Sequence, residues 1–241
     1  MEIISSLEDL EKIKLNKIGE GREGICYSMN NSPLLLKIYR DNQRPEELNG
    51  SNYNSPYIAF PKDIIKDKEG NIIASTMPYV PGIQIIEGFP EHLEINKIKE
   101  AYYKILDELK KFPDIYMGDL CLDNLLYDEK NNSFNIIDTI QWRNYPDSFG
   151  LNYARLDQNL SASLYENIKW LSEYDFWRNN IEFANNFRRS KEEDFIYFIK
   201  YLDQAIEIIS NYFNKEIVTF GDLSPKLKKK SWFLKDLMLL S

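Results

Sequence analysis

Residues 118–138 read Gly-Asp-Leu-Cys-Leu-Asp-Asn-Leu-Leu-Tyr-Asp-Glu-Lys-Asn-Asn-Ser-Phe-Asn-Ile-Ile-Asp, and this stretch decides the fold. Its apolar runs, Leu125 to Asp128 and Phe134 to Ile137, lie on either side of a polar turn at Asn131 and Asn132. Short apolar runs that flank such a turn predict a small β-hairpin. The stretch therefore sets its polar residues around two short strands.

Three of those polar residues carry the chemical signal. Asp119 is followed by Asn124 five positions on, and Asp138 comes fourteen positions after Asn124. Phosphoryl transfer to a hydroxyl group uses this layout, because one carboxylate orients the attacking oxygen and the other two groups hold magnesium on the phosphates. The alternative is three unrelated turn and cap residues, since Asp and Asn favour such places. A second Gly-Asp-Leu at 221–223 has Leu227 where the Asn would stand, so the spacing is more informative than the tripeptide.

Residues 18–25 read Ile-Gly-Glu-Gly-Arg-Glu-Gly-Ile and contain the spacing Gly-x-Gly-x-x-Gly, at Gly19, Gly21 and Gly24. Dinucleotide-binding folds use the same spacing, but there the glycines join a strand to a helix. Here Ile25 to Met29 continues as a predicted strand, so the glycines are expected to cap a hairpin. A hairpin tip without side chains lets backbone N–H groups approach phosphate oxygens. The alternative is an ordinary hairpin turn.

Lys37 lies inside the apolar strand predicted from Leu34 to Tyr39. A lysine in such a strand is costly to bury unless a negative group meets it. The phosphates of a nucleotide would meet it, with Glu46 or Glu47 behind them on a short helix that Pro45 could begin. The alternative is that Lys37 points outward from an alternating strand.

The remaining pattern changes from strands to helices along the chain. Predicted strands cover residues 14–18, 25–29, 34–39, 57–66 and 72–80, with a turn at 67–71 between the last two. Apolar residues three or four apart then predict a helix over 93–111, ended by Pro113. From about residue 152 the chain is expected to be helical, with its clearest apolar stripe at Phe195, Ile199, Leu202, Ile206, Ile209 and Phe213.

Strands first and helices afterwards predict an α+β protein with two lobes. The expected division places a β-rich nucleotide-binding lobe at residues 1–80 and a helical catalytic lobe at residues 81–241, joined near Tyr79 to Gly82.

Composition excludes several functional classes. The formal net charge of −8 argues against nucleic acid as a partner. One histidine, His92, and two distant cysteines, Cys26 and Cys121, do not supply the roughly four ligands of a zinc site or a disulfide framework. No apolar run approaches about eighteen residues and no secretory signal is recognisable, so we expect a cytoplasmic protein without a membrane span.

The order and rough spacing of these motifs, over residues 17 to about 140, resemble the protein-kinase-like superfamily. The resemblance implies a bilobal fold with a small β-rich N-terminal lobe, a mainly helical C-terminal lobe, and ATP and Mg²⁺ in the cleft. It implies Asp119 as the catalytic-loop acid and Asn124 and Asp138 as the metal ligands. Lys37 would be the catalytic strand lysine that contacts the α- and β-phosphates.

The same resemblance implies further nucleotide-binding residues. The three glycines would cover the phosphates, and Glu46 or Glu47 would be the helix partner of the strand lysine. Met77 and Tyr79, in Met-Pro-Tyr-Val-Pro-Gly at 77–82, would lie in the hinge that receives adenine.

The chain departs from the family pattern at four places. Met117 stands where the family usually has His, and Cys121 where Ser/Thr protein kinases have Lys. Asp138-Thr139-Ile140 replaces Asp-Phe-Gly, and no Ala-Pro-Glu closes an activation segment. The Gly118-Asp119 pair looks more like the aminoglycoside and choline kinase branch and like small atypical bacterial kinases.

The first hypothesis is therefore an ATP- and magnesium-dependent phosphotransferase, an atypical Ser/Thr protein kinase, because the loop, lysine and hinge resemble those of protein kinases. A small-molecule kinase of the aminoglycoside or choline kinase type is the alternative, favoured by Gly118-Asp119 and the missing activation segment. The acceptor would be a hydroxyl group of a protein or of a small molecule. A pseudokinase scaffold is the third hypothesis, motivated by Met117 and Thr139-Ile140, although every phosphate- and metal-facing residue is retained.

Overall fold

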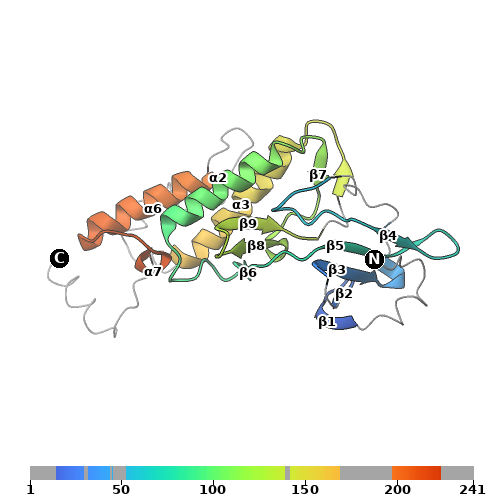
Figure 1. The fold of residues 1–241 in the computed structure, drawn as a ribbon. Helices are drawn as coiled ribbons and strands as arrows, with labels where there is room; N and C mark the ends of the chain where they lie inside the picture. The colour runs from blue at the N-terminus through green and yellow to red at the C-terminus, as the bar shows by residue number, and fades with distance from the viewer. Residues whose placement is uncertain are drawn as a thin grey trace. The chain divides into compact units, whose positions relative to one another are not determined.

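The computed structural model describes residues 15–29, 32–43, 45, 53–138, 142–168 and 197–223. Within these ranges the chain is an α+β protein, with a sheet-rich N-terminal region and long helices later (Figure 1). The predicted fold class is confirmed at this level. None of the described helices combines the length and the apolar character that crossing a membrane requires.

The N-terminal region is a five-stranded antiparallel sheet with the order β1-β2-β3-β5-β4. Its strands are β1 (Leu15–Glu20), β2 (Gly24–Met29), β3 (Leu34–Tyr39), β4 (Ile64–Lys66) and β5 (Ile72–Pro78). Leu36, Ile65 and Ala74 belong to a buried apolar cluster of this sheet. The predicted strand at 34–39 is confirmed with the same bounds, and so is the turn at 67–71.

The strand predicted at 57–66 is mostly wrong, because only Ile64–Lys66 pairs with β5. Before it, Ile58 makes only an isolated parallel bridge with Ile136. Pro61 also has no N–H group to donate to a neighbouring strand. The apolar residues 58–60 are instead buried, and Ala59 N donates to Ile136 O, in the hairpin that the sequence predicts within residues 118–138.

The hairpin predicted within residues 118–138 is confirmed. It consists of antiparallel strands with a third short strand beside β8, namely β6 (Ile83–Gln84), β8 (Leu125–Asp128) and β9 (Ser133–Ile136). Asp128 stabilises the turn, because its Oδ1 accepts hydrogen bonds from Lys130 N at 3.0 Å and Asn131 N at 3.3 Å. Local side-chain bonds of this kind are the reason why Asp and Asn favour turns.

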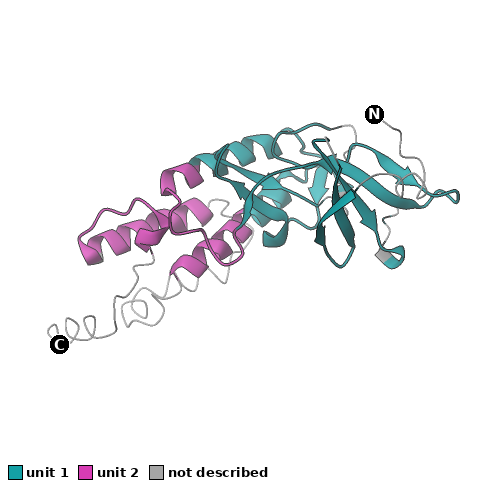
Figure 2. Cartoon of the chain, turned by 60° about the horizontal axis from the view of Figure 1, so that its bottom comes forward, with its two compact units in different colours: residues 1–84, 100–156 teal, residues 85–99, 157–241 magenta. Residues whose placement is uncertain are grey.

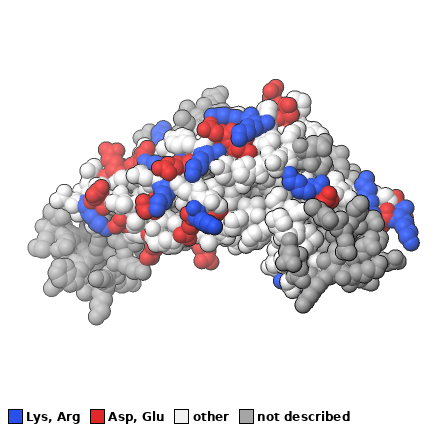
Figure 3. Space-filling model, in the orientation of Figure 1, with Lys and Arg blue, Asp and Glu red and all other residues white. Residues whose placement is uncertain are grey.

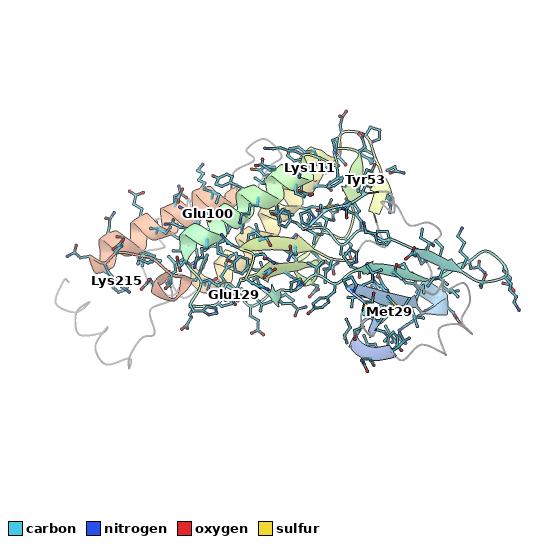
Figure 4. The ribbon with its side chains drawn as sticks, in the orientation of Figure 1. Met29, Tyr53, Glu100, Lys111, Glu129 and Lys215 are labelled. Carbon is cyan, nitrogen blue, oxygen red and sulfur yellow. The ribbon has the colours of Figure 1, made fainter. Side chains whose placement is uncertain are left out.

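Helix α2 (Ile95–Leu109) supports the hairpin and is two residues shorter at each end than the predicted helix. Its apolar stripe is buried, with Ile98, Tyr102, Ile105 and Leu109 at most 1% exposed. On its polar side, Glu100 Oε2 accepts a hydrogen bond from Asn132 Nδ2 at 2.9 Å, and Lys104 Nζ donates to Asn132 O at 2.9 Å. Figure 4 labels Glu100 on this helix.

Three aromatic rings attach the segment before β4 to the end of α2. The ring centroids of Tyr53, Phe60 and Phe112 lie 4.8 to 5.4 Å from one another. Tyr53 and the neighbouring Lys111 are labelled in Figure 4. Each such ring pair contributes about 0.5–1.5 kcal/mol beyond the area it buries. Because the same segment carries Ile58, the rings help to hold the five-stranded sheet against the hairpin.

Contacts group the chain into two compact units that interleave along the sequence (Figure 2). The first unit holds the described residues up to Gln84 and those from Glu100 to Leu156, including every described strand. The second holds residues 85–99 and the described residues from Asp157 onward. The division into lobes at residues 1–80 and 81–241 stays a prediction.

The second unit is helical. Its helices are the first residues of α2, the later part of α3 (Phe149–Ile168), α6 (Tyr197–Phe213) and the short α7 (Phe220–Leu223). In the predicted apolar stripe, Ile199, Leu202 and Ile209 are buried. Phe195, the first residue of that stripe, lies outside the described residues.

Asp222, in the second Gly-Asp-Leu tripeptide, is the third residue of α7, and its carboxylate bonds back to the residues just before the helix, as the acid of a capping box does. Its Oδ2 accepts hydrogen bonds from Thr219 N at 2.9 Å and Val218 N at 3.1 Å, and its Oδ1 pairs with Lys215. Partial burial opposes the charged form of this carboxyl, but these bonds outweigh burial and hold the pKa of Asp222 well below its usual value. The residue therefore serves local structure.

Asp222→Asn keeps an acceptor oxygen but removes its charge, and should lower the free energy of unfolding at pH 7 by about 1 kcal/mol, because hydrogen bonds to a charged group contribute roughly that much more than neutral ones. A lowered carboxyl pKa contributes stability above the ordinary pKa of about 4, and this contribution is lost as the pH falls toward the folded-state pKa. The difference from wild type should therefore shrink below about pH 4. Thermal unfolding of wild type and variant at pH 7 and below about pH 4 measures this difference. The exposed Glu216→Gln variant is the control, and an equal loss in that variant would contradict the capping role.

Charged side chains on the described surface are mixed in sign. On the face drawn in Figure 3, acidic and basic residues lie interspersed. Pairs such as Lys97–Glu94 at 2.7 Å and Lys110–Asp107 at 2.8 Å have side chains at least half exposed. Exposed pairs of this kind contribute about 0–1 kcal/mol. A charged group that is buried is therefore a stronger indication of function than these surface pairs.

Candidate functional site

The glycine-bearing segment forms the tip of the β1–β2 hairpin, as predicted. Gly19 lies opposite Cys26 in the register, and Gly21 N donates to Gly24 O at 2.9 Å across the turn. A Cβ added at Gly24 would stand 2.1 Å from the backbone oxygen of Ile38, whereas at Gly19 or Gly21 it would meet nothing within 4 Å. Only the last glycine is therefore required by packing. The first two leave open space over the tip.

Lys37 projects from the middle of β3 into a buried, acidic environment. In the register it lies opposite Cys26 on one side and Ser75 on the other. Its side chain is only 7% exposed, and its Nζ lies 2.6 Å from Asp138 Oδ2 and 2.9 Å from Glu23 Oε2. The alternative in which this lysine points outward to solvent is therefore wrong.

Two carboxylates keep the Lys37 ammonium charged. Burial alone would lower the pKa of Lys37, but the attraction of Asp138 and the hydrogen bonds to Asp138 and Glu23 outweigh it, and the pKa lies above its usual value. The ammonium also lies 5.7 Å from the centroid of the Tyr39 ring, where a cation is attracted by the ring face. A permanently charged, partly dehydrated cation at this position can bind anionic oxygen atoms.

Asp138 reaches Lys37 from the end of the hairpin in an unusual backbone conformation. Its φ is 61°, in the left-handed region that non-glycine residues rarely adopt. Such a residue costs about 1–3 kcal/mol and persists only where its surroundings hold it. The preceding residue provides one such restraint, because Ile137 N donates to Asn124 O at 2.9 Å.

Asn124 bonds to Asp119 and to Ile137, the residue before Asp138. It ends a short 3-10 helix over Leu122–Asn124, and its side chain is largely buried. Its Nδ2 donates to Asp119 O at 2.9 Å and to Asp119 Oδ2 at 3.1 Å. The four polar residues predicted as catalytic or metal-binding thus lie in two contacting pairs, Asp119 with Asn124 and Asp138 with Lys37, and the backbone bond between Ile137 and Asn124 links the two pairs.

Two residues of α3 hold the strand and loop that lead to Asp119. Strand β7 (Ile115–Met117) pairs with β10 (Trp142–Asn144), and the loop follows it. Asn152 Oδ1 accepts from Met117 N at 2.8 Å, while its Nδ2 donates to Ile115 O. Arg155 donates to Gly118 O. Sequence reasoning missed both residues; their three-residue spacing indicates a shared helix face but not what that face contacts.

Glu23 is the other residue that sequence reasoning missed, although it lies inside the glycine-bearing segment. The available signal was an acid beside Gly24, whose strand pairs with the strand of Lys37. The two residues proposed as the partner of Lys37, Glu46 and Glu47, lie outside the described residues.

The two hinge residues are placed differently from each other. Met77 is buried and lies on β5 two residues after Ser75, on the same side of the sheet as Lys37. Tyr79 is 59% exposed, and its N–H donates to Pro33 O at 2.8 Å. Tyr79 lines a cavity of about 540 Å³ together with residues 54–57 and the β8–β9 hairpin, and Lys37 does not line it. Among the described residues, neither a hydrogen bond nor this cavity connects Tyr79 with Lys37.

The thiols beside the site are weak candidates for nucleophiles. Burial raises the pKa of Cys26, which lies opposite Lys37. Burial and the nearby Asp119 charge raise the pKa of Cys121. Since the thiolate is the reactive form, these shifts favour the inert thiol at both positions.

Asp119, Asn124 and Asp138 offer side-chain oxygen atoms, but they do not enclose a complete metal site. Among the described residues, no group of three or more His, Cys, Asp or Glu side chains gathers as a metal site. Asn124 donates through its nitrogen to Asp119, which leaves its amide oxygen for another partner. One amide oxygen and one carboxylate match how proteins hold magnesium, with a few protein oxygens, water and substrate phosphates.

A scan against protein-family models and a search of curated proteins gave no match. Among solved structures, the chain is similar to a kinase of the Cydia pomonella granulovirus, with 18% sequence identity and a TM-score of 0.43. The alignment covers 57% of this chain and 57% of the viral chain, so the match spans little more than half of either protein.

Proposed function

We propose that this chain is an ATP- and magnesium-dependent phosphotransferase of the protein-kinase-like type, with a hydroxyl group as acceptor. The observation that carries the proposal is the 2.6 Å contact between Lys37 Nζ and Asp138 Oδ2 across 101 positions of sequence. This contact joins the strand lysine to the end of the β8–β9 hairpin, which directly follows Asp119 and Asn124. A chance set of turn and cap residues has no reason to meet a buried lysine of another sheet.

Each residue then has a role that its position supports. Lys37 would bind phosphate oxygens and offset their charge, which is the main source of rate enhancement in such sites. The N–H groups near Gly19 and Gly21 would approach the phosphates where no side chain intervenes. Asp119 would orient the acceptor hydroxyl and receive its proton.

Asn124 and Asp138 would hold Mg²⁺ through oxygen atoms. When bound, the ion would draw off negative charge from the transferring phosphoryl group. For Asp138, metal binding would compete with its pairing to Lys37, because both partners use the same carboxylate. Met77 would contact the base from the buried side of the sheet, and the exposed Tyr79 ring would lie at its edge.

The proposed acceptor is a Ser or Thr hydroxyl of a protein, with a small-molecule hydroxyl as the alternative. The test incubates the full chain with radiolabelled ATP and Mg²⁺, first alone and then with sugars, aminoglycosides and choline. Label on Ser or Thr of the chain itself would support the protein acceptor, whereas label on a panel compound alone would support the small-molecule acceptor. Partner binding without ATP turnover in Mg²⁺ or Mn²⁺ would instead identify a scaffold.

A further inference from the structure

Glu23 contacts the same Lys37 ammonium to which the proposed function assigns the nucleotide phosphates. It lies at the tip of the β1–β2 hairpin between Arg22 and Gly24, where the proposed phosphate contacts are made. Its side chain is only 13% exposed and turns inward, so that Oε2 lies 2.9 Å from Lys37 Nζ. A carboxylate and a phosphate oxygen make the same charge-assisted bond to an ammonium.

The charges around Lys37 do not favour addition of a further anion. One ammonium already faces two carboxylates, those of Glu23 and Asp138. If Asp138 transferred to magnesium, Lys37 would still be paired with Glu23. A nucleotide phosphate would then approach an ion pair of no net charge, whose negative member is Glu23, rather than a free cation. Like charges in such a partly buried place repel more strongly than in water.

We propose that Glu23 competes with the nucleotide phosphates for the Lys37 ammonium, so that phosphate binding requires this carboxylate to leave. The inference rests on the proposed function, because it names a residue that sets nucleotide affinity at the same site. Only molecules in which Glu23 has swung away are competent, and apparent affinity falls in proportion to that fraction. The open space over Gly19 and Gly21 gives the tip room to move.

The matched variants are Glu23→Gln and Glu20→Gln. The first keeps the shape of the side chain and removes the charge that faces Lys37. The second removes the same charge from the same hairpin, but Glu20 pairs with Lys17 and Arg40 and is 39% exposed. Because Asp138 still neutralises Lys37 in Glu23→Gln, the variant is expected to fold, which circular dichroism checks.

Isothermal titration with ADP and Mg²⁺ at about 0.15 M ionic strength, where distant surface charges are screened, gives the readout. Glu23→Gln should bind about tenfold more tightly than wild type, as expected if the pairing leaves about one molecule in ten competent. Glu20→Gln should bind as wild type does. That pair of results supports the competition.

Three other results would overturn it. Equal or weaker binding by Glu23→Gln, while wild type binds ADP, would show that Glu23 positions Lys37 or is neutral, and the proposed phosphotransferase would stand. Equal tightening in both variants would indicate a general charge effect, and the proposed function would again stand. Absence of ADP binding in wild type and in both folded variants would overturn the proposed function, and the competition with it.

Discussion

The Asp119→Ala variant should transfer phosphate roughly 10²–10⁴ times more slowly than wild type, the range that general-base catalysis contributes. Its affinity for ADP and Mg²⁺ should remain unchanged. The physical reason is that Asp119 contacts the site through Asn124 and has no contact with Lys37 among the described hydrogen bonds. Asn124 Nδ2 also bonds to the backbone oxygen of residue 119 at 2.9 Å, and this bond survives truncation.

Single-turnover kinetics with radiolabelled ATP and titration with ADP separate the two effects. Asp123→Ala is the matched control, because Asp123 is an exposed acid in the same short helix as Asn124. We expect its transfer rate to equal that of wild type. Normal turnover in Asp119→Ala would contradict the role of Asp119 in the reaction, and loss of ADP binding with a normal fold would make it a binding residue.

The second large effect concerns the three glycines, which the sequence presents as equivalent. Gly24→Ala should destabilise the fold by about 1–3 kcal/mol, the usual result of forcing an extra carbon into a packed position. Its new Cβ would stand 2.1 Å from the oxygen and 3.0 Å from the carbonyl carbon of Ile38. Both are backbone atoms of the paired strand, so relief requires β2 and β3 to separate.

Gly19→Ala and Gly21→Ala are the matched controls. Their new carbon atoms would meet nothing within 4 Å, so thermal unfolding should match that of wild type. ADP binding should weaken in these two variants, since a methyl group would stand where phosphates approach the backbone. Equal destabilisation in all three variants would contradict the packing argument. Unchanged ADP affinity in Gly19→Ala and Gly21→Ala would contradict the phosphate role of the tip.

Local pattern was enough to predict the elements that carry the site. The hairpin at 125–136 follows from two apolar runs around a polar turn, and its turn is stabilised by Asp128 as turn chemistry leads one to expect. The burial of Lys37 was inferred from its apolar strand, and the structure places this lysine beside Asp138. In each case the signal lies within a few residues, where sequence determines geometry directly.

Features that depend on distant packing could not be predicted in this way. Residues 57–63 have the pattern of a strand but pack as an irregular segment, because Ile58 meets Ile136 of another hairpin. The bonds of Asn152 and Arg155 depend on how a helix lies against a loop about 35 residues earlier. The left-handed backbone of Asp138 has only a weak local signal, since Asp and Asn enter this region more readily than most residues but most of those in the chain do not.

The two partners of Lys37 become available at very different times during synthesis. Glu23 precedes it by fourteen positions, whereas Asp138 follows it by 101. At typical translation rates roughly 5–20 s separate the addition of Lys37 from that of Asp138. During that interval Glu23 of the β1–β2 hairpin can already neutralise the Lys37 ammonium on β3. The first strands can therefore pair without burying an unpaired charge. Only when residue 138 has been added can the lysine gain its second carboxylate, beside the one that Glu23 already supplies.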